Sequence, residues 1–132
     1  MLKLEIVTPE RKVVDVTADS VTVPTVNGEI GIMQNHAPLI STLKAGILSY
    51  AAGGRTEKLV ISGGFVEVGA NVVSVLADVA ETGAEINVEA ARTEAAEVER
   101  LLAGWGGTEE DFEAEVERLE RAQARQRLAA AR

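Results

Sequence analysis

The sequence predicts a β + α protein, in which a sandwich or flattened barrel of short β-strands precedes an antiparallel two-helix hairpin. The chain has 132 residues, and all 3 of its prolines and nine of its 12 glycines fall before residue 86. The rest is dominated by Ala, Glu, Arg and Leu, which are strong helix formers, whereas Gly and Pro mark turns. This change of composition indicates one boundary, between a β domain at 1–85 and a helical domain at 86–132.

The first 82 residues read as short strands joined by turns. Leu2, Leu4 and Ile6 alternate with more polar neighbours, and this period of two predicts a strand with one buried face. The Asn27-Gly28 pair favours the left-handed backbone of a tight hairpin turn. Further strands are expected at 13–17, 20–23, 45–50, 59–62, 65–68 and 72–76. Strands of this length and spacing indicate a sandwich or flattened barrel with a core of Val, Ile and Leu.

Two helices are predicted after residue 86. Asn87 can cap the first, and the glycine-rich segment 104–107 ends it. Thr108 with Asp111 resembles a capping box at the start of the second. The apolar positions recur every three or four residues, at Ala91, Ala95, Val98 and Leu102 in the first helix and at Phe112, Val116, Leu119 and Ala122 in the second. Both stripes are narrow, so we expect a hairpin of modest stability that can detach.

Composition excludes several classes of function. The absence of cysteine rules out disulfide scaffolds, thiol nucleophiles and the common zinc fingers, and one histidine removes most histidine-based metal sites. A net charge of -8 argues against general binding to nucleic acid. No apolar run approaches the ~20 residues that span a bilayer. These features favour a protein that binds partners and has neither catalytic nor metal-ligating residues.

An enzyme centred on His36 is the alternative that the residues leave open. His36 is the only histidine, the residue type most often used as a general base, and Glu29 is a conceivable partner and Ser41 a conceivable nucleophile. Such a site needs a base, an orienting group and an oxyanion donor in one pocket, and nothing in the sequence requires them to converge. We therefore expect His36 to order its own loop or to contact a partner.

Several motifs occur in a fixed order along the chain. They are Gly28-Glu29-Ile30-Gly31-Ile32, Asn35-His36-Ala37-Pro38-Leu39, Ile61-Ser62-Gly63-Gly64-Phe65-Val66-Glu67-Val68 and Val75-Leu76-Ala77-Asp78. This ordered set closely resembles the epsilon subunits of bacterial and chloroplast ATP synthase, over essentially the whole chain. The resemblance implies a ten-stranded β-sandwich followed by a C-terminal antiparallel two-helix hairpin. It also implies a non-catalytic rotor subunit of the central stalk, which couples proton translocation to ATP synthesis at the cytoplasmic face of the bacterial plasma membrane.

The resemblance assigns partners to the sandwich. In that family the sandwich binds the gamma subunit and sits on the loops of the membrane rotor ring. The implied interface residues are Gly28, Glu29, Ile30, Gly31 and Ile32, facing the ring with Glu29 at the tip, and His36 and Pro38 near gamma. An unrelated sandwich-and-hairpin adaptor protein is the alternative from another functional class.

The resemblance also implies a regulatory role for the hairpin, which in the family lies against the sandwich or extends into the catalytic head and inhibits ATP hydrolysis. Arg118, Arg121 and Arg125 share a helix face and are expected to meet acidic helices of the catalytic subunits in the extended form. The alternative is that these arginines balance Glu117 and Glu120 in a solvated hairpin.

Some members of the family bind ATP where the sandwich meets the hairpin, through a pattern of Ile or Leu, Asp, two variable residues, Arg and Ala. The corresponding residues here are Ile86, Asn87, Val88, Glu89, Ala90 and Ala91. Asn87 replaces the acid and Ala90 the arginine. Arg92 lies two positions later, which is roughly 200° around a helix. We therefore expect weak or absent ATP binding and no cofactor.

Overall fold

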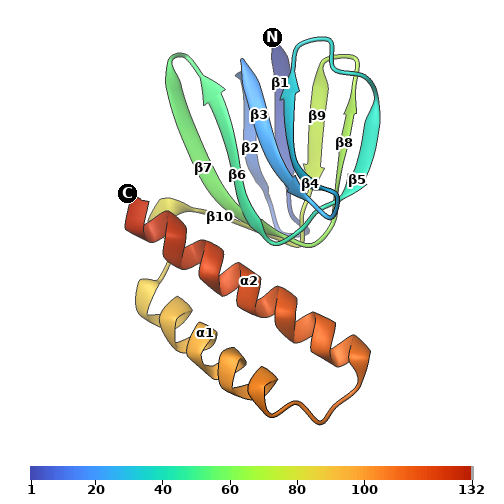
Figure 1. Cartoon of the computed structure of the whole chain (residues 1–132). Coiled ribbons are helices and arrows are strands. Elements are labelled where there is room, and N and C mark those ends of the chain that lie inside the picture. The colour runs from blue at the N-terminus through green and yellow to red at the C-terminus, as the bar shows by residue number, and fades with distance from the viewer. Residues whose placement is uncertain (132) are drawn as a thin grey trace.

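A computed structural model describes residues 1–131, so Arg132, the last residue of the predicted helical domain, lies outside the described residues. The chain folds into ten strands in two five-stranded sheets, followed by two packed helices (Figure 1). This confirms the predicted ten-stranded sandwich and C-terminal hairpin. None of the helices within 1–131 is long and apolar enough to cross a bilayer.

The strands follow one another through short turns. They are β1 (Leu2–Val7), β2 (Lys12–Ala18), β3 (Ser20–Thr25), β4 (Gly28–Met33), β5 (Leu39–Thr42), β6 (Gly46–Ala52), β7 (Arg55–Ser62), β8 (Phe65–Gly69), β9 (Val72–Leu76) and β10 (Val79–Thr82). One sheet has the order β2-β1-β9-β8-β5, and the other β10-β7-β6-β3-β4. Strand neighbours pair antiparallel except β1 and β9, which are parallel.

The core between the sheets is built from alternate residues of the strands. In β1 the buried residues are Leu2, Leu4 and Ile6, each with no exposed surface, as the period of two predicts. Leu48 and Ile61 face them from the second sheet in the same apolar cluster. The core therefore consists of aliphatic side chains, in line with the low aromatic content of the sequence.

A glycine turn between β7 and β8 brings two backbones close together. Gly64 has φ of 87°, a conformation that side chains disfavour. A Cβ at Gly64 would also overlap the carbonyl oxygen of Leu76 in β9. Position 64 therefore requires glycine for both its backbone angle and its close approach to β9.

A single helical turn joins the last strand of the sandwich to the helices. It is the 3₁₀ helix η1 (Gly83–Glu85), where Glu85 accepts hydrogen bonds from the Thr82 backbone at 3.0 Å and its hydroxyl at 2.9 Å. Arg11, in the turn between β1 and β2, reaches the other Glu85 oxygen at 2.6 Å. The hydrogen bonds from Thr82, and then Arg11, hold the pKa of Glu85 below its ordinary value of 4.5. The turn is thus tied to the sandwich.

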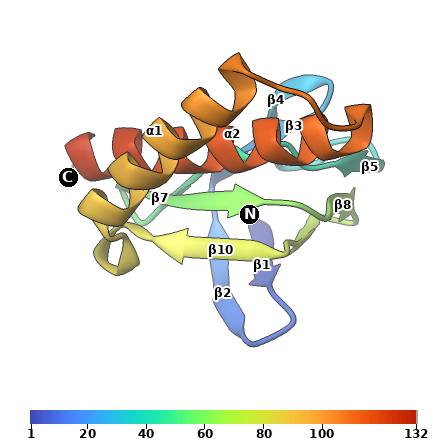
Figure 2. The same cartoon turned by 90° about the horizontal axis from the view of Figure 1, so that it is seen from below.

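The helices are α1 (Val88–Ala103) and α2 (Glu109–Ala131). They form an antiparallel pair (Figures 1 and 2), and α2 lies between α1 and the sandwich. α2 packs on β6 and β7, whereas α1 packs mainly on α2. Asn87 caps α1 by accepting from the Ala90 N–H at 3.0 Å, and Thr108 accepts from the Asp111 N–H at 3.1 Å before α2.

Because α2 lies between α1 and the sandwich, its buried face differs from the predicted one. Ala122 is buried as predicted, but so are Ala124 and Leu128, which the predicted stripe does not contain. Ala124 and Leu128 pack with Val60 of β7 and with Ile86. The prediction of one narrow stripe on the second helix is therefore wrong, because α2 has to cover both α1 and the sheet.

Candidate interaction surfaces

A tight turn joins β3 to β4 at one edge of the sandwich. Thr25 pairs with Gly28, so the turn itself is Val26 and Asn27, and Gly28 follows with φ of 105°. The Thr25 hydroxyl donates to the Gly28 carbonyl at 2.6 Å and accepts from the Asn27 N–H at 3.2 Å. The predicted Asn27-Gly28 turn is thus shifted by one residue, because the threonine side chain closes it.

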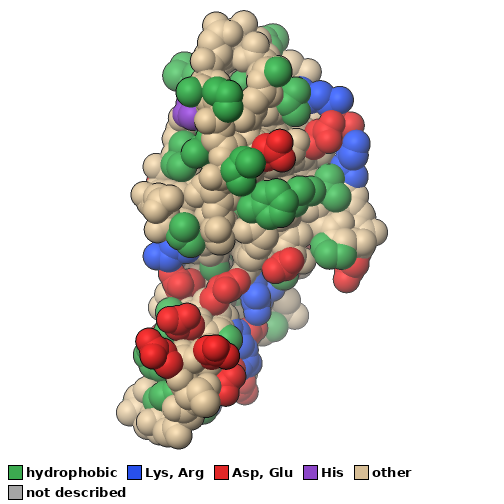
Figure 3. All heavy atoms as spheres, turned by 90° about the vertical axis from the view of Figure 1, so that its right-hand side faces the viewer, with side chains coloured by type: hydrophobic (Ala, Val, Ile, Leu, Met, Phe, Trp, Pro, Cys, Tyr) green, Lys and Arg blue, Asp and Glu red, His purple; other side chains and the backbone are tan. Residues whose placement is uncertain are grey.

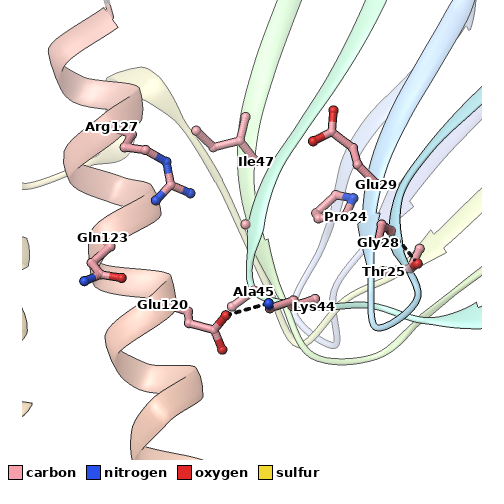
Figure 4. A pocket seen from close by; sticks show the side chains of 11 residues that line it. Pro24, Thr25, Gly28, Glu29, Lys44, Ala45, Ile47, Glu120, Gln123 and Arg127 are labelled. Atoms are coloured by element: carbon pink, nitrogen blue, oxygen red, sulfur yellow. Dashed lines mark hydrogen bonds and ion pairs between the residues drawn. The ribbon is translucent and has the colours of Figure 1, made fainter.

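Glu29 lies inside β4 rather than at the tip of this turn, which corrects the expected placement. It is exposed and lines a groove between the sandwich and α2 (Figure 4), together with Arg127 of α2. Of the remaining segment, Gly31 is exposed, Ile30 is half-buried and Ile32 belongs to the core. One face of this segment is therefore available to a partner, and the other anchors it in the sandwich.

His36 lies in the loop between β4 and β5. Its Nδ1 is 2.7 Å from the Ala37 carbonyl oxygen, and its backbone N–H donates to the Met33 carbonyl at 3.2 Å. The neighbouring Asn35, with φ of 67°, donates its N–H to the side chain of Asn71 at 2.7 Å. The loop is thus ordered by its own contacts and by the turn between β8 and β9.

The elements of the alternative hydrolase do not converge. Glu29 is near the start of β4 and His36 is beyond its end, which separates them by at least ~13 Å of strand. The Ser41 hydroxyl is buried without a hydrogen-bond partner. Within residues 1–131 no three His, Asp or Glu side chains are placed to hold a metal ion.

An apolar patch lies on the outer face of β5, β8 and β9, beside the β3–β4 turn that carries Val26, and it was not among the predicted surfaces. It consists of Val26, Ile40, Phe65 and Leu76, which are 59, 71, 42 and 39% exposed. Phe65 pairs with Leu76 across β8 and β9, and it lines one hollow with Val26 and Ile40. Figure 3 shows hydrophobic side chains gathered on this side of the sandwich. The exposure of Phe65 follows from the sequence pattern, because alternation in β8 puts Phe65 on the face opposite the buried Val66.

The three arginines of α2 lie against carboxylates and the sheet in the docked hairpin. Arg118 donates to Glu94 of α1 at 2.8 Å, which raises the pKa of the guanidinium. Arg125 donates to Glu81 of β10 at 2.6 Å. Arg121 lies 3.4 Å from the hydroxyl of Ser62 in β7. All three are therefore engaged inside the protein in this arrangement.

The acids that were expected to balance these arginines have other partners. Glu117 accepts a hydrogen bond from Ser62 at 2.9 Å, and Glu120 pairs with Lys44 at 3.1 Å. The alternative of a solvated Glu117 and Glu120 network is therefore wrong in its details. These two acids connect α2 to the sandwich instead.

The residues at the expected ATP position have structural roles. Ile86 is buried beside α2, Asn87 caps α1, Ala91 is buried and Ala90 is exposed. They border a cavity of about 220 Å³ that is also lined by Glu81, Glu85, Glu94 and Arg125. Arg92 pairs with Glu89 on the exposed side of α1. Three carboxylates and one arginine, itself paired, disfavour a phosphate group in this cavity.

Comparisons define the class of this protein first through its sandwich. Residues 1–83 match the family described as the ATP synthase delta/epsilon chain β-sandwich domain. The whole fold is similar to a chain of the mitochondrial ATP synthase of Euglena gracilis, solved as OSCP/F1/c-ring, with a TM-score of 0.80 at 25% identity over 98% of this chain and 80% of that one.

Similarity to curated relatives extends into the helices. The ATP synthase epsilon chain of Carboxydothermus hydrogenoformans is 56% identical over 69% of this chain and 68% of its own. That of Anaeromyxobacter sp. strain K is 41% identical over 94% of both. The chain belongs to the ATP synthase epsilon chain family, the non-catalytic central-stalk subunits of F-type ATP synthase. This excludes the unrelated adaptor and the small hydrolase.

Proposed function

We propose that the chain is held in the central stalk by two surfaces of its sandwich. The apolar patch, with His36 and Pro38 at the entrance to β5, binds the gamma subunit. The segment Gly28 to Ile32 contacts the loops of the rotor ring. In this position the chain transmits rotation between ring and shaft, and so couples proton translocation to ATP synthesis without chemistry of its own.

The exposed apolar patch is the observation that carries the gamma assignment. Large aliphatic and aromatic side chains on an outer sheet face are a mark of a protein interface. Burying Ile40 and Phe65 against a partner yields about 25 cal/mol per Å² of apolar surface, before the costs of association. His36 and Pro38 directly precede β5, which carries Ile40, so a partner on the patch also reaches their loop.

The ring assignment is supported by Glu29 and its surroundings. The carboxylate is exposed on a strand that the sandwich core holds rigid through Ile32. A rigidly placed carboxylate can accept hydrogen bonds from backbone amides or basic side chains of ring loops. The similar Euglena chain belongs to an assembly solved with its c-ring, which supports a contact with the ring. The chain is then peripheral to the cytoplasmic face of the bacterial plasma membrane, through the complex.

Binding to purified gamma tests the first surface. Ile40→Asp places a charge in the apolar patch and is expected to weaken binding at least tenfold. Leu101→Asp is the control away from the patch, because Leu101 is also an exposed aliphatic residue, at 45% against 71% for Ile40, but lies on α1. Equal affinities for Ile40→Asp and the unmodified chain would refute the proposal. Copurification of Glu29→Lys with the ring tests the second surface in the same way.

We also propose that the released hairpin restrains ATP hydrolysis through Arg118, Arg121 and Arg125, which then contact acidic helices of the catalytic subunits. This is supported by the cationic face that they share once their internal contacts are broken. Reversal of Arg121 and Arg125 to Glu is expected to raise ATP hydrolysis by the assembled enzyme, and so is reconstitution with residues 1–85 alone. Unchanged rates in both cases would remove this role.

ATP is not expected to act on the hairpin directly. The cavity beside Asn87 and Ala90 is lined by Glu81, Glu85 and Glu94, so phosphate groups would meet mainly negative charge. Calorimetry on the isolated chain tests this expectation. Weak or absent heat of binding is the expected outcome, and micromolar affinity would contradict it.

A further inference from the structure

A chain of ion pairs connects the sandwich with α2 and α1. Arg125 of α2 donates to Glu81 of β10 at 2.6 Å, and its Nη1 is 3.5 Å from Glu94 of α1. The same Glu94 accepts from Arg118 at 2.8 Å, and Arg118 also pairs with Glu115 at 3.2 Å. Arg125 is thus a side chain that reaches both the sandwich and the outer helix.

The surroundings of Arg125 strengthen these contacts. Its side chain is 18% exposed, and those of Glu81 and Glu94 are 25 and 23% exposed. Partly buried pairs are screened less by salt than surface pairs, and hydrogen bonds between charged groups are the stronger kind. Without Arg125, the carboxylates of Glu81 and Glu94 would face each other across the junction and repel.

Arg121, one turn earlier on α2, offers a contrast. Its Nη1 is 3.4 Å from the Ser62 hydroxyl, and its Nε is buried without a hydrogen-bond partner. Within residues 1–131, no carboxylate lies within ion-pair distance of it. Arg121 as a whole is half-buried, and an N–H donor that is buried without an acceptor costs free energy. Docking therefore leaves one donor of Arg121 unsatisfied, whereas it gives Arg125 two carboxylates.

The apolar contact between the hairpin and the sandwich is small. Its apolar cluster has four buried members, Val60, Ile86, Ala124 and Leu128. A cluster of this size leaves a large share of the docking free energy to the polar contacts. The balance between docked and released hairpin is therefore sensitive to single charges on α2.

We propose that Arg125 is a counter-ion latch that holds the acidic hairpin on the sandwich, and that Arg121 is a built-in opposing charge that keeps this latch releasable. Arg125 neutralises Glu81 and Glu94 at once, so one side chain ties α2 to β10 on one side and to α1 on the other. The latch belongs to the isolated chain and needs no ATP synthase partner.

The separation of the hairpin from the sandwich can be measured directly. The chain has no cysteine, so Lys58→Cys on β7 and Ala131→Cys on α2 accept a pair of nitroxide labels. Both positions line one hollow in the docked form. The dipolar coupling between the labels, measured by electron paramagnetic resonance, is strong when docked and weak when released.

Matched variants then test the latch. Arg125→Gln is expected to raise the ratio of released to docked chains at least tenfold, whereas Arg121→Gln, with the same charge change and a similar helix propensity, leaves the ratio unchanged or lowers it. Glu81→Gln is expected to release the hairpin when Arg125 is present. In the Arg125→Gln background it is expected to add no further release and to restore docking in part, because the repulsion between Glu81 and Glu94 is then removed.

Three results would overturn the proposal: an unchanged ratio in Arg125→Gln, an equal rise in Arg121→Gln, or full additivity of Glu81→Gln with Arg125→Gln. The measurement contains neither gamma nor the catalytic head. Failure of the latch therefore leaves the proposed partner surfaces standing, and failure of gamma binding leaves the latch standing.

Discussion

Leu128→Ala is expected to release the hairpin while leaving the sandwich folded. Leu128 is 6% exposed and packs in the docking cluster with Val60 and Ile86. Truncation to alanine removes three carbons, worth about 0.8 kcal/mol each, and the cavity left behind adds to the loss. Because Leu128 is in water in the released form, almost all of this loss falls on the docked form. A loss of about 2 kcal/mol raises the ratio of released to docked chains about thirtyfold.

Amide hydrogen exchange followed by mass spectrometry is the assay. Peptides of α1 and α2 should lose protection in Leu128→Ala, because most of the stability of a helix in a protein comes from packing of its apolar face. Peptides of β1 should stay protected. Leu101→Ala, at a position that is 45% exposed on α1, is the matched control and should leave protection unchanged. Unchanged α2 protection in Leu128→Ala, or an equal loss in the control, would refute the assignment of the docking contact.

Three further predictions concern local features. Gly64→Ala should lower the free energy of unfolding by about 3 kcal/mol or more in chemical denaturation, because position 64 combines a positive φ with a backbone overlap. Gly69→Ala is the control and should cost far less, because the space around Gly69 is open. The stability advantage of the unmodified chain over Glu85→Gln should be fully present above pH 4.5 and vanish as the pH falls through the lowered pKa of Glu85; a gap that persists in acid would contradict the role of Thr82 and Arg11. Asn87→Ala should cost about 1 kcal/mol and speed exchange in the first turn of α1, and unaltered exchange there would rule out the cap.

Strongly patterned elements could be predicted from the sequence, and short ones could not. The alternation of β1 and the capped helices were visible because each repeats a period several times. β5 and β10 have four residues each, too few to establish a period, so the count of ten depended on the resemblance to a family. The β3 to β4 turn was misplaced by one residue, because Thr25 closes it through its side chain.

The features of the candidate surfaces that depend on neighbouring residues in the chain could be predicted, and those that depend on packing between elements could not. The exposure of Glu29 follows from its place beside a turn, but its position opposite α2 depends on packing. Likewise, Arg121 and Arg125 are equivalent in sequence, on one face of one helix. Only the docking of α2 gives one of them two carboxylates and the other a serine hydroxyl.

The parallel ladder between β1 and β9 has a consequence for biosynthesis. β1 lies inside its sheet, with Lys3 paired to Thr17 on one side and to Val72 on the other. Pairing of β1 with β9 closes a long loop, which is entropically costly and slow. β1 can therefore pair with β2 early, but it gains its second neighbour only when nearly the last strand of the sandwich has left the ribosome. The hairpin then emerges onto a sandwich that is already complete. Shortening the chain from its start should therefore split the sandwich, whereas ending it at residue 85 should leave the ten strands intact.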